Sequence, residues 1–397
     1  MDAQGEETRE KKIKNPKKGV KGNSILSCFP MCDRSTAVFQ EYMHGIMGLV
    51  KQFLELWLET NSPCNLKGHR DEINRMLGSF KRPDYVTRSP NTTKKISKWK
   101  ANECRTFLLY LSLIILANFM TPRYLQHWML FVLAIYLLLQ DSVTENDIQK
   151  AEVMLNIFLR DFPTLYPVIS LTYNFHTLNH YGLTTRRIGP LFSNNAFFWE
   201  DFNGSLSERI HGTKNQAIEL VKTIQLFQGV QILKARVENK RISEVGCARF
   251  LTKIPSFKMT NVQRNLLAES NLELREVFYR AEIFGEVFTC NTYERQSEKN
   301  NFTISYTDSS TGSKRYGEIH CFFECTGGEK MAFVDCFVIE HLKMFCHESG
   351  VVVKHIIPIR RSEEIHFVPL QNILSKAGAD TRGGNRGNVP PPQNRKM

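Results

Sequence analysis

Hydrophobic and polar residues follow two different periods along this chain. Up to about residue 240, apolar residues recur every three or four positions, which is typical of amphipathic helices. The pattern predicts a helix over Tyr42–Glu59, ended before Pro63. It also predicts a helical stretch over Trp99–Arg160, in which Thr144 and Asp147 form a capping-box signature.

Two strongly apolar segments lie within that helical stretch. Phe107–Met120 and Trp128–Leu139 are each shorter than the roughly 18–20 residues that a membrane-spanning helix needs. We therefore expect two core helices packed as a hairpin, and no membrane partner. A further amphipathic helix is predicted over Thr213–Arg236. The apolar residues expected on its inner face are Ile218, Val221, Ile224, Val230 and Leu233.

After about residue 275 the period changes to two, which is typical of β-strands. Short strands separated by turns predict a small barrel of the SH3-like or OB type. The predicted strands are Val277–Cys290, Asn301–Asp308, Lys314–Cys325, Lys330–Ile339, Val351–Ile359 and Ile365–Leu370.

The fold class expected from these patterns is α+β, with a mainly helical region followed by a small β-barrel-like domain. A strand at Ser24–Val38 could precede the first helix. The expected parts are a basic disordered tail at 1–22, a mostly helical region at 23–240, a helical linker at 241–275, the barrel at 276–376 and a disordered tail at 377–397.

Charge points toward a polyanionic partner. The chain has 52 Lys and Arg against 40 Asp and Glu, a net charge of +12, which favours binding to nucleic acid. The excess is concentrated in residues 64–100. This segment is either an ordinary solvated surface or a track that contacts DNA phosphates. The candidate DNA-binding residues are Lys81, Arg82, Arg88, Lys94, Lys95 and Lys98.

Three clusters of polar residues could carry chemistry. Glu41 and His44 stand at the entrance of the first helix, where an acid serves either as a metal ligand or as a partner of the helix dipole. His176 and His180 are four residues apart and would share a helix face, as a metal pair or as polar core or DNA-facing groups. Glu200 is surrounded by aromatic residues, where a buried acid needs an ion pair or a metal.

A series of short motifs occurs in a particular order. They are Lys18–Leu26, Glu41–Gly48 (Glu-Tyr-Met-His-Gly-Ile-Met-Gly), Trp99–Tyr110, Tyr173–His180 (Tyr-Asn-Phe-His-Thr-Leu-Asn-His), Gly189–Leu191, Phe198–Gly204 (Phe-Trp-Glu-Asp-Phe-Asn-Gly), Ile210–Asn215 and Tyr316–Phe322. This series resembles CACTA-type (En/Spm-like) cut-and-paste DNA transposases of the animal branch, over residues 17–375.

The resemblance implies an RNase H-like core in which three carboxylates hold two Mg²⁺ or Mn²⁺ ions for strand cleavage. It matches Glu200 to the late catalytic glutamate and places Glu41 where relatives usually have Asp. The first catalytic Asp is expected upstream of residue 18, so the resemblance implies an N-terminally truncated remnant. The motif residues expected to brace this core are His44, Asn174, His176 and His180.

The sequence therefore predicts a nuclear, transposase-derived protein that binds duplex DNA, mostly through phosphates, without cutting it. One alternative is a metal-dependent DDE-type transposase or nuclease completed by a partner. The other is a protein-interaction module in the barrel, with an aromatic cage that competes with simple core packing. Self-association or a protein partner is a further expectation. The candidate cage residues are Tyr306, Tyr316, Phe322 and Phe323.

Overall fold

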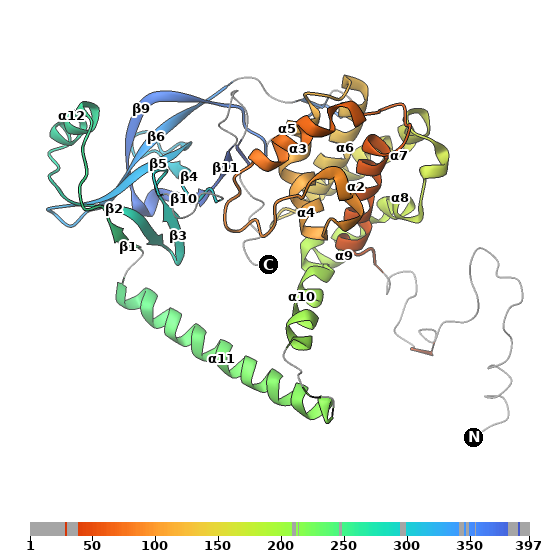
Figure 1. Ribbon diagram of the computed structural model, residues 1–397, viewed down its shortest axis with the longest axis horizontal. Coiled ribbons are helices and arrows are strands. Elements are labelled where there is room, and N and C mark those ends of the chain that lie inside the picture. The colour runs from red at the N-terminus through yellow and green to blue at the C-terminus, as the bar shows by residue number, and fades with distance from the viewer. Residues whose placement is uncertain are drawn as a thin grey trace, which may run out of the picture. The chain divides into compact units, whose positions relative to one another are not determined.

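The computed structural model places elements in most of the chain (Figure 1). It divides into two units, Met1–Gln40 and Glu41–Met397, and all elements described below belong to the second. The basic tail at 1–22 lies outside the described residues, as does nearly all of the predicted strand at Ser24–Val38. The described residues are 28–29, 39–208, 212, 214–245, 248–293, 299–340, 345–346, 349–353, 355–379 and 388–389.

Helices form the first part of the larger unit. The predicted helix over Tyr42–Glu59 is confirmed as α2, and the capping box at Thr144 and Asp147 opens α7. The α-helices are α2 Tyr42–Leu58, α3 Arg70–Ser79, α4 Ala101–Thr106, α5 Ser112–Leu116, α6 Pro122–Leu138, α7 Glu145–Leu165, α8 Tyr173–Thr177, α9 Tyr181–Ile188, α10 Ala196–Ser207 and α11 Gln216–Val245.

Short helical turns connect several of these helices. Phe107–Leu111 is a π-helical turn, η5, which joins α4 to α5 without a break. The 3₁₀ turns are η3 Lys67–His69, η4 Thr93–Lys98, η6 Val168–Ser170, η7 Leu178–His180 and η8 Leu191–Asn194.

The two apolar segments become core helices, as predicted. η5 and α5 contain the first segment up to Leu116, α6 contains the second up to Leu138, and most residues of both segments are buried. Among the described residues, no helix combines the length and the apolar character that crossing a membrane requires. α6 packs along α7 and also contacts α5 and η5.

Phe53 of α2 lies at the centre of the helical core. Its ring is fully buried, and seven aromatic rings from α2 itself and from three other helices and their ends surround it at centroid distances of 5.1–6.5 Å. These rings belong to Trp57, Trp128, Phe131, Phe158, Phe162, Tyr166 and Phe175. The cluster fixes α2 against α6, α7 and α8, and so positions the N-terminus of α2.

The second part of the unit is an antiparallel sheet of eight strands that curls into a barrel-like shape (Figure 1). β5 pairs with β6 along one edge, while its other edge pairs first with β4 and then with β2. The strands are β1 Ala248–Lys253, β2 Leu274–Ile283, β3 Glu286–Thr289, β4 Thr303–Thr307, β5 Lys314–Cys325, β6 Lys330–Ile339, β9 Ile359–Pro369 and β10 Ile373–Lys376.

Two of the predicted strands are exact and two others are wrong. β5 and β6 have the predicted bounds. Val277–Cys290 is a hairpin rather than one strand, because Phe284 and Gly285 adopt positive φ values of 48° and 81° and turn the chain between β2 and β3. Of the described residues in Val351–Ile359, those in strands are Val351–Val352 (β8) and the first residue of β9; β8 pairs with β7, Phe345–Cys346.

The predicted aromatic cage is also wrong, because all four rings are buried. Tyr306 and Phe322 belong to the core on one face of the sheet, whereas Phe323 belongs to the core on the other face, together with Leu267 of α12 (Asn261–Glu269). Tyr316 belongs to a third, separate cluster. Adjacent strand residues point to opposite faces, so Phe322 and Phe323 cannot line one pocket.

Three further expectations differ from the structure. The predicted helical linker at 241–275 contains strand β1 as well as α12, and β1 pairs with β2 in the main sheet. The tail at 377–397, expected to be disordered, contains a short strand pair, β11 Gly378–Ala379 with β12 Asn388–Val389. The third expectation, that the apolar residues of α11 form an inner face, also differs from the structure.

The apolar residues of α11 are not inside the protein. Ile218, Val221, Val230 and Leu233 are each more than half exposed, and Ile224 is half-buried. The reason is geometric: these side chains are distributed around most of the helix circumference rather than along one stripe, so a single packing surface cannot cover them.

Candidate carboxylate–histidine site and basic surface

Glu41 is the N-cap of α2, and its carboxylate is fully used. Oε1 accepts hydrogen bonds from the backbone N–H groups of Met43 and Ala196 at 2.6 and 2.7 Å, and Oε2 accepts one from His44 N at 2.7 Å. Ala196 is the first residue of α10, so one carboxylate satisfies the N-termini of two helices. Of the two roles considered for Glu41, its contacts are those of a partner of the helix dipole rather than of a metal ligand.

His44 connects the two acids that the sequence singled out. Its Nδ1 lies 2.8 Å from Glu41 Oε2, and its Nε2 lies 3.3 Å from Glu200 Oε1. Two elements that are 155 residues apart, α2 and α10, are brought together by the Glu41–Ala196 hydrogen bond. Only an imidazolium ring can donate to both carboxylates at once. The result is a carboxylate–imidazole–carboxylate chain at the surface.

Glu200 is not buried among aromatic rings, contrary to the sequence expectation. Its side chain is 60% exposed, and none of the residues of α10 that the structure describes is buried. Phe198 and Trp199 are also exposed, whereas Phe197 of the same helix packs partly buried against the helical core. Glu200 therefore needs no metal to compensate for burial.

The two glycines of Glu-Tyr-Met-His-Gly-Ile-Met-Gly explain how this site is assembled. A methyl group at Gly45 would collide with the hydroxyl of Tyr181, and one at Gly48 would lie 2.9 Å from the amide nitrogen of Asn174. The Tyr181 hydroxyl donates to the backbone carbonyl of Glu41 at 3.0 Å. Asn174, predicted as a bracing residue, therefore packs directly on α2. These close approaches hold α8 and α9 against the first turns of α2.

Arg105 is a part of this neighbourhood that the sequence analysis missed. It lies on α4 beside the buried Tyr42 and Tyr110. Burial raises the pKa of Tyr42 to about 12, and the nearby Arg105 opposes that rise. No sequence signal marked this arginine, because it is one of several polar residues in the short helix α4, beside Asn102 and Glu103.

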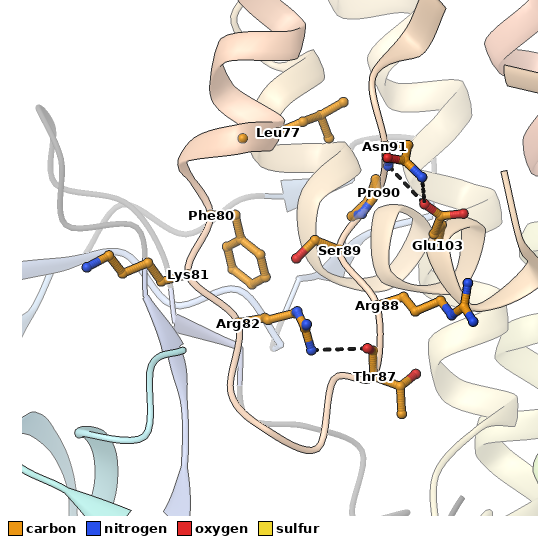
Figure 2. A pocket seen from close by; sticks show the side chains of 11 residues that line it. Leu77, Phe80, Lys81, Arg82, Thr87, Arg88, Ser89, Pro90, Asn91 and Glu103 are labelled. Carbon is orange, nitrogen blue, oxygen red and sulfur yellow. Dashed lines mark hydrogen bonds between the residues drawn. The ribbon is translucent and has the colours of Figure 1, made fainter. Parts of the chain in front are cut away.

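The predicted DNA-binding segment begins as an irregular loop between α3 and η4 (Figure 2). It borders a pocket of about 600 Å³ to which Lys81, Arg82 and Arg88 contribute. Figure 2 shows Arg82 reaching across the loop to Thr87, while Lys81 extends away from it. The loop is anchored to α4 by the Thr106 hydroxyl, which donates to the carbonyl of Arg88 at 2.9 Å.

Arg82 has a different role from the one predicted. Its guanidinium donates to the carbonyls of Val86 at 2.5 Å and Thr87 at 3.1 Å, so it braces the loop from within. Its own carbonyl accepts from Asn300 N at 2.8 Å. A half-buried arginine with these partners is not a free phosphate-binding group, and we remove it from the candidate set.

The other candidate cations remain available to a ligand. All are exposed, and none forms an ion pair with a carboxylate in the described part of the chain. η4 presents three of the lysines on a short 3₁₀ segment whose Ile96 and Thr93 are buried beneath them. The exposed set, called the basic surface below, is Lys81, Arg88, Lys94, Lys95 and Lys98.

An acid also borders the pocket, but its oxygens are occupied. Glu103 is 2% exposed, and it accepts hydrogen bonds from Asn91 N and Nδ2 at 3.1 and 2.7 Å (Figure 2). It also accepts one from Lys100 N at 2.6 Å. These donors, which lie in the loop and just before α4, stabilise the negative charge of the Glu103 carboxylate. Glu103 organises the basic surface rather than neutralising its lysines.

The remaining predicted pair lies on η7 and α8. His176 is exposed and His180 is half-buried, and their Nε2 atoms lie 3.4 Å apart. Neither histidine is in the core, so the polar-core reading of this pair is wrong. No hydrogen bond links the pair to Glu41, His44 or Glu200 among the contacts of the described residues.

The site does not fit the two-metal centre that the resemblance implied. Both carboxylate oxygens of Glu41 are occupied, because each lies within hydrogen-bonding distance of two nitrogen atoms. The carboxylate of Glu200 faces the imidazole of His44. Within the residues that the structure describes, no group of three or more His, Cys, Asp or Glu side chains is arranged to hold a metal ion. A two-metal site needs shared carboxylate oxygens that are free to ligate.

Comparison with known proteins leaves the family open. No protein-family model and no curated protein sequence matches this chain.

Proposed function

We propose that this chain is a transposase-derived protein that binds duplex DNA through its phosphates and does not cut it. The observation that carries the proposal is the basic surface: five exposed cations within 18 residues, without carboxylate partners in the described part of the chain. Such a surface favours a polyanion, since each contacted phosphate releases a condensed counterion. The ordered motif series supports DNA as the polyanion and a nuclear location.

The lack of cleavage is argued from Glu41. Its carboxylate caps α2 and α10, and withdrawing it to ligate a metal would leave backbone N–H groups of both helices unsatisfied. Loss of an N-cap costs about 0.5–2 kcal/mol for one helix.

The basic surface lies on the loop and turn that precede α4, and α4 carries Arg105 beside Tyr42. The cations and the Glu41–His44–Glu200 chain are thus connected through one helix.

The test is binding of the full chain to a labelled duplex across a salt series from about 50 to 200 mM. The variant Lys94→Gln, Lys95→Gln, Lys98→Gln should bind more weakly, and its slope of log affinity against log salt should be shallower by about 2 to 3, since each phosphate contact contributes about 0.9. The matched control is Lys150→Gln, Lys222→Gln, Lys258→Gln, which removes the same charge from exposed positions elsewhere. Equal losses in both triple variants, or no binding by the unaltered chain at 50 mM salt, would contradict the proposal.

The same assay tests the absence of cleavage. Supercoiled DNA incubated with the protein and Mg²⁺ or Mn²⁺ should stay intact. Nicking that disappears in Glu200→Ala, a change at an exposed position with little effect on folding, would instead support the metal-dependent nuclease.

A further inference from the structure

His176 and His180 form a pair of imidazoles that the proposed DNA binding does not use. They lie one helical turn apart, at the end of α8 and the end of η7. Their Nε2 atoms face each other at 3.4 Å, with the rings at 75° to one another. The two nitrogens are thus neighbours rather than separate groups in solvent.

The separation matches a shared metal ligand position. Zinc–nitrogen bonds of about 2.0–2.1 Å at a tetrahedral angle place two ligating nitrogens about 3.3–3.4 Å apart. The 3.4 Å between the two Nε2 atoms therefore equals the spacing of two nitrogen ligands of one zinc ion. Cis positions of an octahedral or square-planar ion would bring the nitrogens nearer, to about 2.8–3.0 Å at the same bond lengths.

The backbone beneath the pair is held firmly. Phe175, next to His176, and Leu178, between the two histidines, are 1% and 0% exposed. Phe175 also belongs to the aromatic cluster around Phe53. The Asn179 amide donates to the carbonyl of His176 at 3.1 Å, which closes the turn between the two rings. The ligand positions are therefore set by the core before any metal binds, which lowers the ordering cost of binding.

We propose that His176 and His180 bind a borderline transition-metal ion, with Zn²⁺ as the best geometric match. Two neutral imidazoles are ligands that suit Zn²⁺, Cu²⁺ and Ni²⁺ and not Mg²⁺ or Ca²⁺. In the described part of the chain no third side chain completes the site. The remaining positions are thus open to water or to a donor atom from a partner. This site is separate from the Glu41–His44–Glu200 chain and does not depend on DNA binding.

The experiment is titration of the full chain with Zn²⁺ alone against a chromophoric chelator, in the unaltered protein and in His176→Ala and His180→Ala. Either change should weaken zinc binding by at least about tenfold, since even outer-sphere partners of zinc ligands are worth that much. Zn²⁺ should also raise the melting temperature of the unaltered chain and not of the variants, because only a ligand of the native state stabilises it. Both positions are at or near the surface, so the variants should keep the helical circular dichroism of the parent.

Two control variants make the result specific. His69→Ala removes an exposed histidine near a carboxylate, Glu72, and should leave zinc affinity unchanged. His44→Ala removes the exposed histidine next to Glu41 and should also leave zinc affinity unchanged. Co²⁺ bound at the pair should give the intense visible absorption of tetrahedral coordination, lost in His176→Ala. The proposal is overturned if the two pair variants bind zinc as the parent does, which would leave the pair as a simple imidazole hydrogen bond, or if His44→Ala alone abolishes binding.

Discussion

His127 of α6 is a buried histidine at the edge of the aromatic cluster. It is 3% exposed, its ring stacks on Phe158 at a centroid distance of 4.3 Å, and its Nε2 lies 2.9 Å from the Phe158 carbonyl oxygen. Burial lowers the pKa of His127 to about 4, although the Phe158 carbonyl opposes the shift. The ring is therefore neutral in the folded protein at neutral pH, with Nε2–H as the donor.

This lowered pKa predicts acid sensitivity. The unfolded chain, with a histidine pKa of about 6.5, takes up the proton first as the pH falls, so the stabilising contribution of neutral His127 is complete above about pH 6.5 and is lost as the pH falls toward 4. At pH 5 the loss from this group should be about 2 kcal/mol. The check is urea unfolding at pH 7.5 and pH 5.0: His127→Gln should lose about 2 kcal/mol less than the parent over this interval.

His69→Gln serves as the control, because it removes a histidine from the surface rather than from the core. An identical pH dependence in His127→Gln and the parent would show that other groups cause the acid sensitivity. His355 is also fully buried, and burial lowers its pKa to about 3, so a residual acid sensitivity is expected in every variant.

At the scale of elements, α2 carries both the core and the site. Its apolar face provides Phe53, while its N-terminus provides Glu41 and His44. The helices differ sharply in this respect: α2 is packed on several sides, whereas α10 has no buried residue and α11 has exposed apolar side chains. Substitutions of equal size should therefore have very different effects on these helices.

Phe53→Ala should lower the free energy of unfolding by about 3–5 kcal/mol, because it removes a ring that seven neighbours enclose. Phe198→Ala in α10 removes the same atoms from a ring that is 62% exposed, and should change stability by no more than about 0.5 kcal/mol. Chemical unfolding followed by circular dichroism measures both. A loss below about 1 kcal/mol in Phe53→Ala would contradict the packing described for the core.

At the scale of the larger unit, a buried ion pair links the basic loop to the sheet. Lys376 of β10 is 3% exposed, and its Nζ lies 2.8 Å from both carboxylate oxygens of Asp84. The Asp84 N–H donates to the side chain of Asn301, and the Arg82 carbonyl accepts from Asn300 N. The loop that carries Lys81 and Arg88 is thus held by residues from the β-rich part of the same unit.

Asp84→Ala should destabilise the protein by about 3 kcal/mol, because among the described residues it leaves the buried ammonium of Lys376 with Glu286, at 3.9 Å, as its remaining carboxylate, beside the ring of Phe288. It should also weaken DNA binding, since the basic surface loses its anchor. Glu72→Ala, which removes an exposed acid, should change stability by less than about 0.5 kcal/mol. Thermal melting and the duplex-binding assay measure the two effects, and unchanged melting of Asp84→Ala would refute this anchoring role.

The spacing of apolar residues and the helix-capping residues were enough to predict the elements that have strong local signals. The helix from Tyr42, the Thr144–Asp147 capping box and strands β5 and β6 were predicted because each residue's neighbours along the chain decide them. The hairpin at Phe284 and Gly285 was missed because strand alternation continues through the turn. The helix predicted at α11 is present, but its predicted inner face is wrong, because its apolar residues are spread around the helix rather than along one stripe.

The candidate site needed contacts between distant parts of the chain. The sequence singled out Glu41, His44 and Glu200 separately, but only the folding of α10 against α2 joined them, and only that arrangement showed Glu41 to be a double helix cap. Arg82 looked like its cationic neighbours until the loop folded and gave its donors backbone partners. Local patterns determine secondary structure through interactions within a few residues, whereas exposure, charge neutralisation and ligand geometry depend on neighbours that the fold alone brings together.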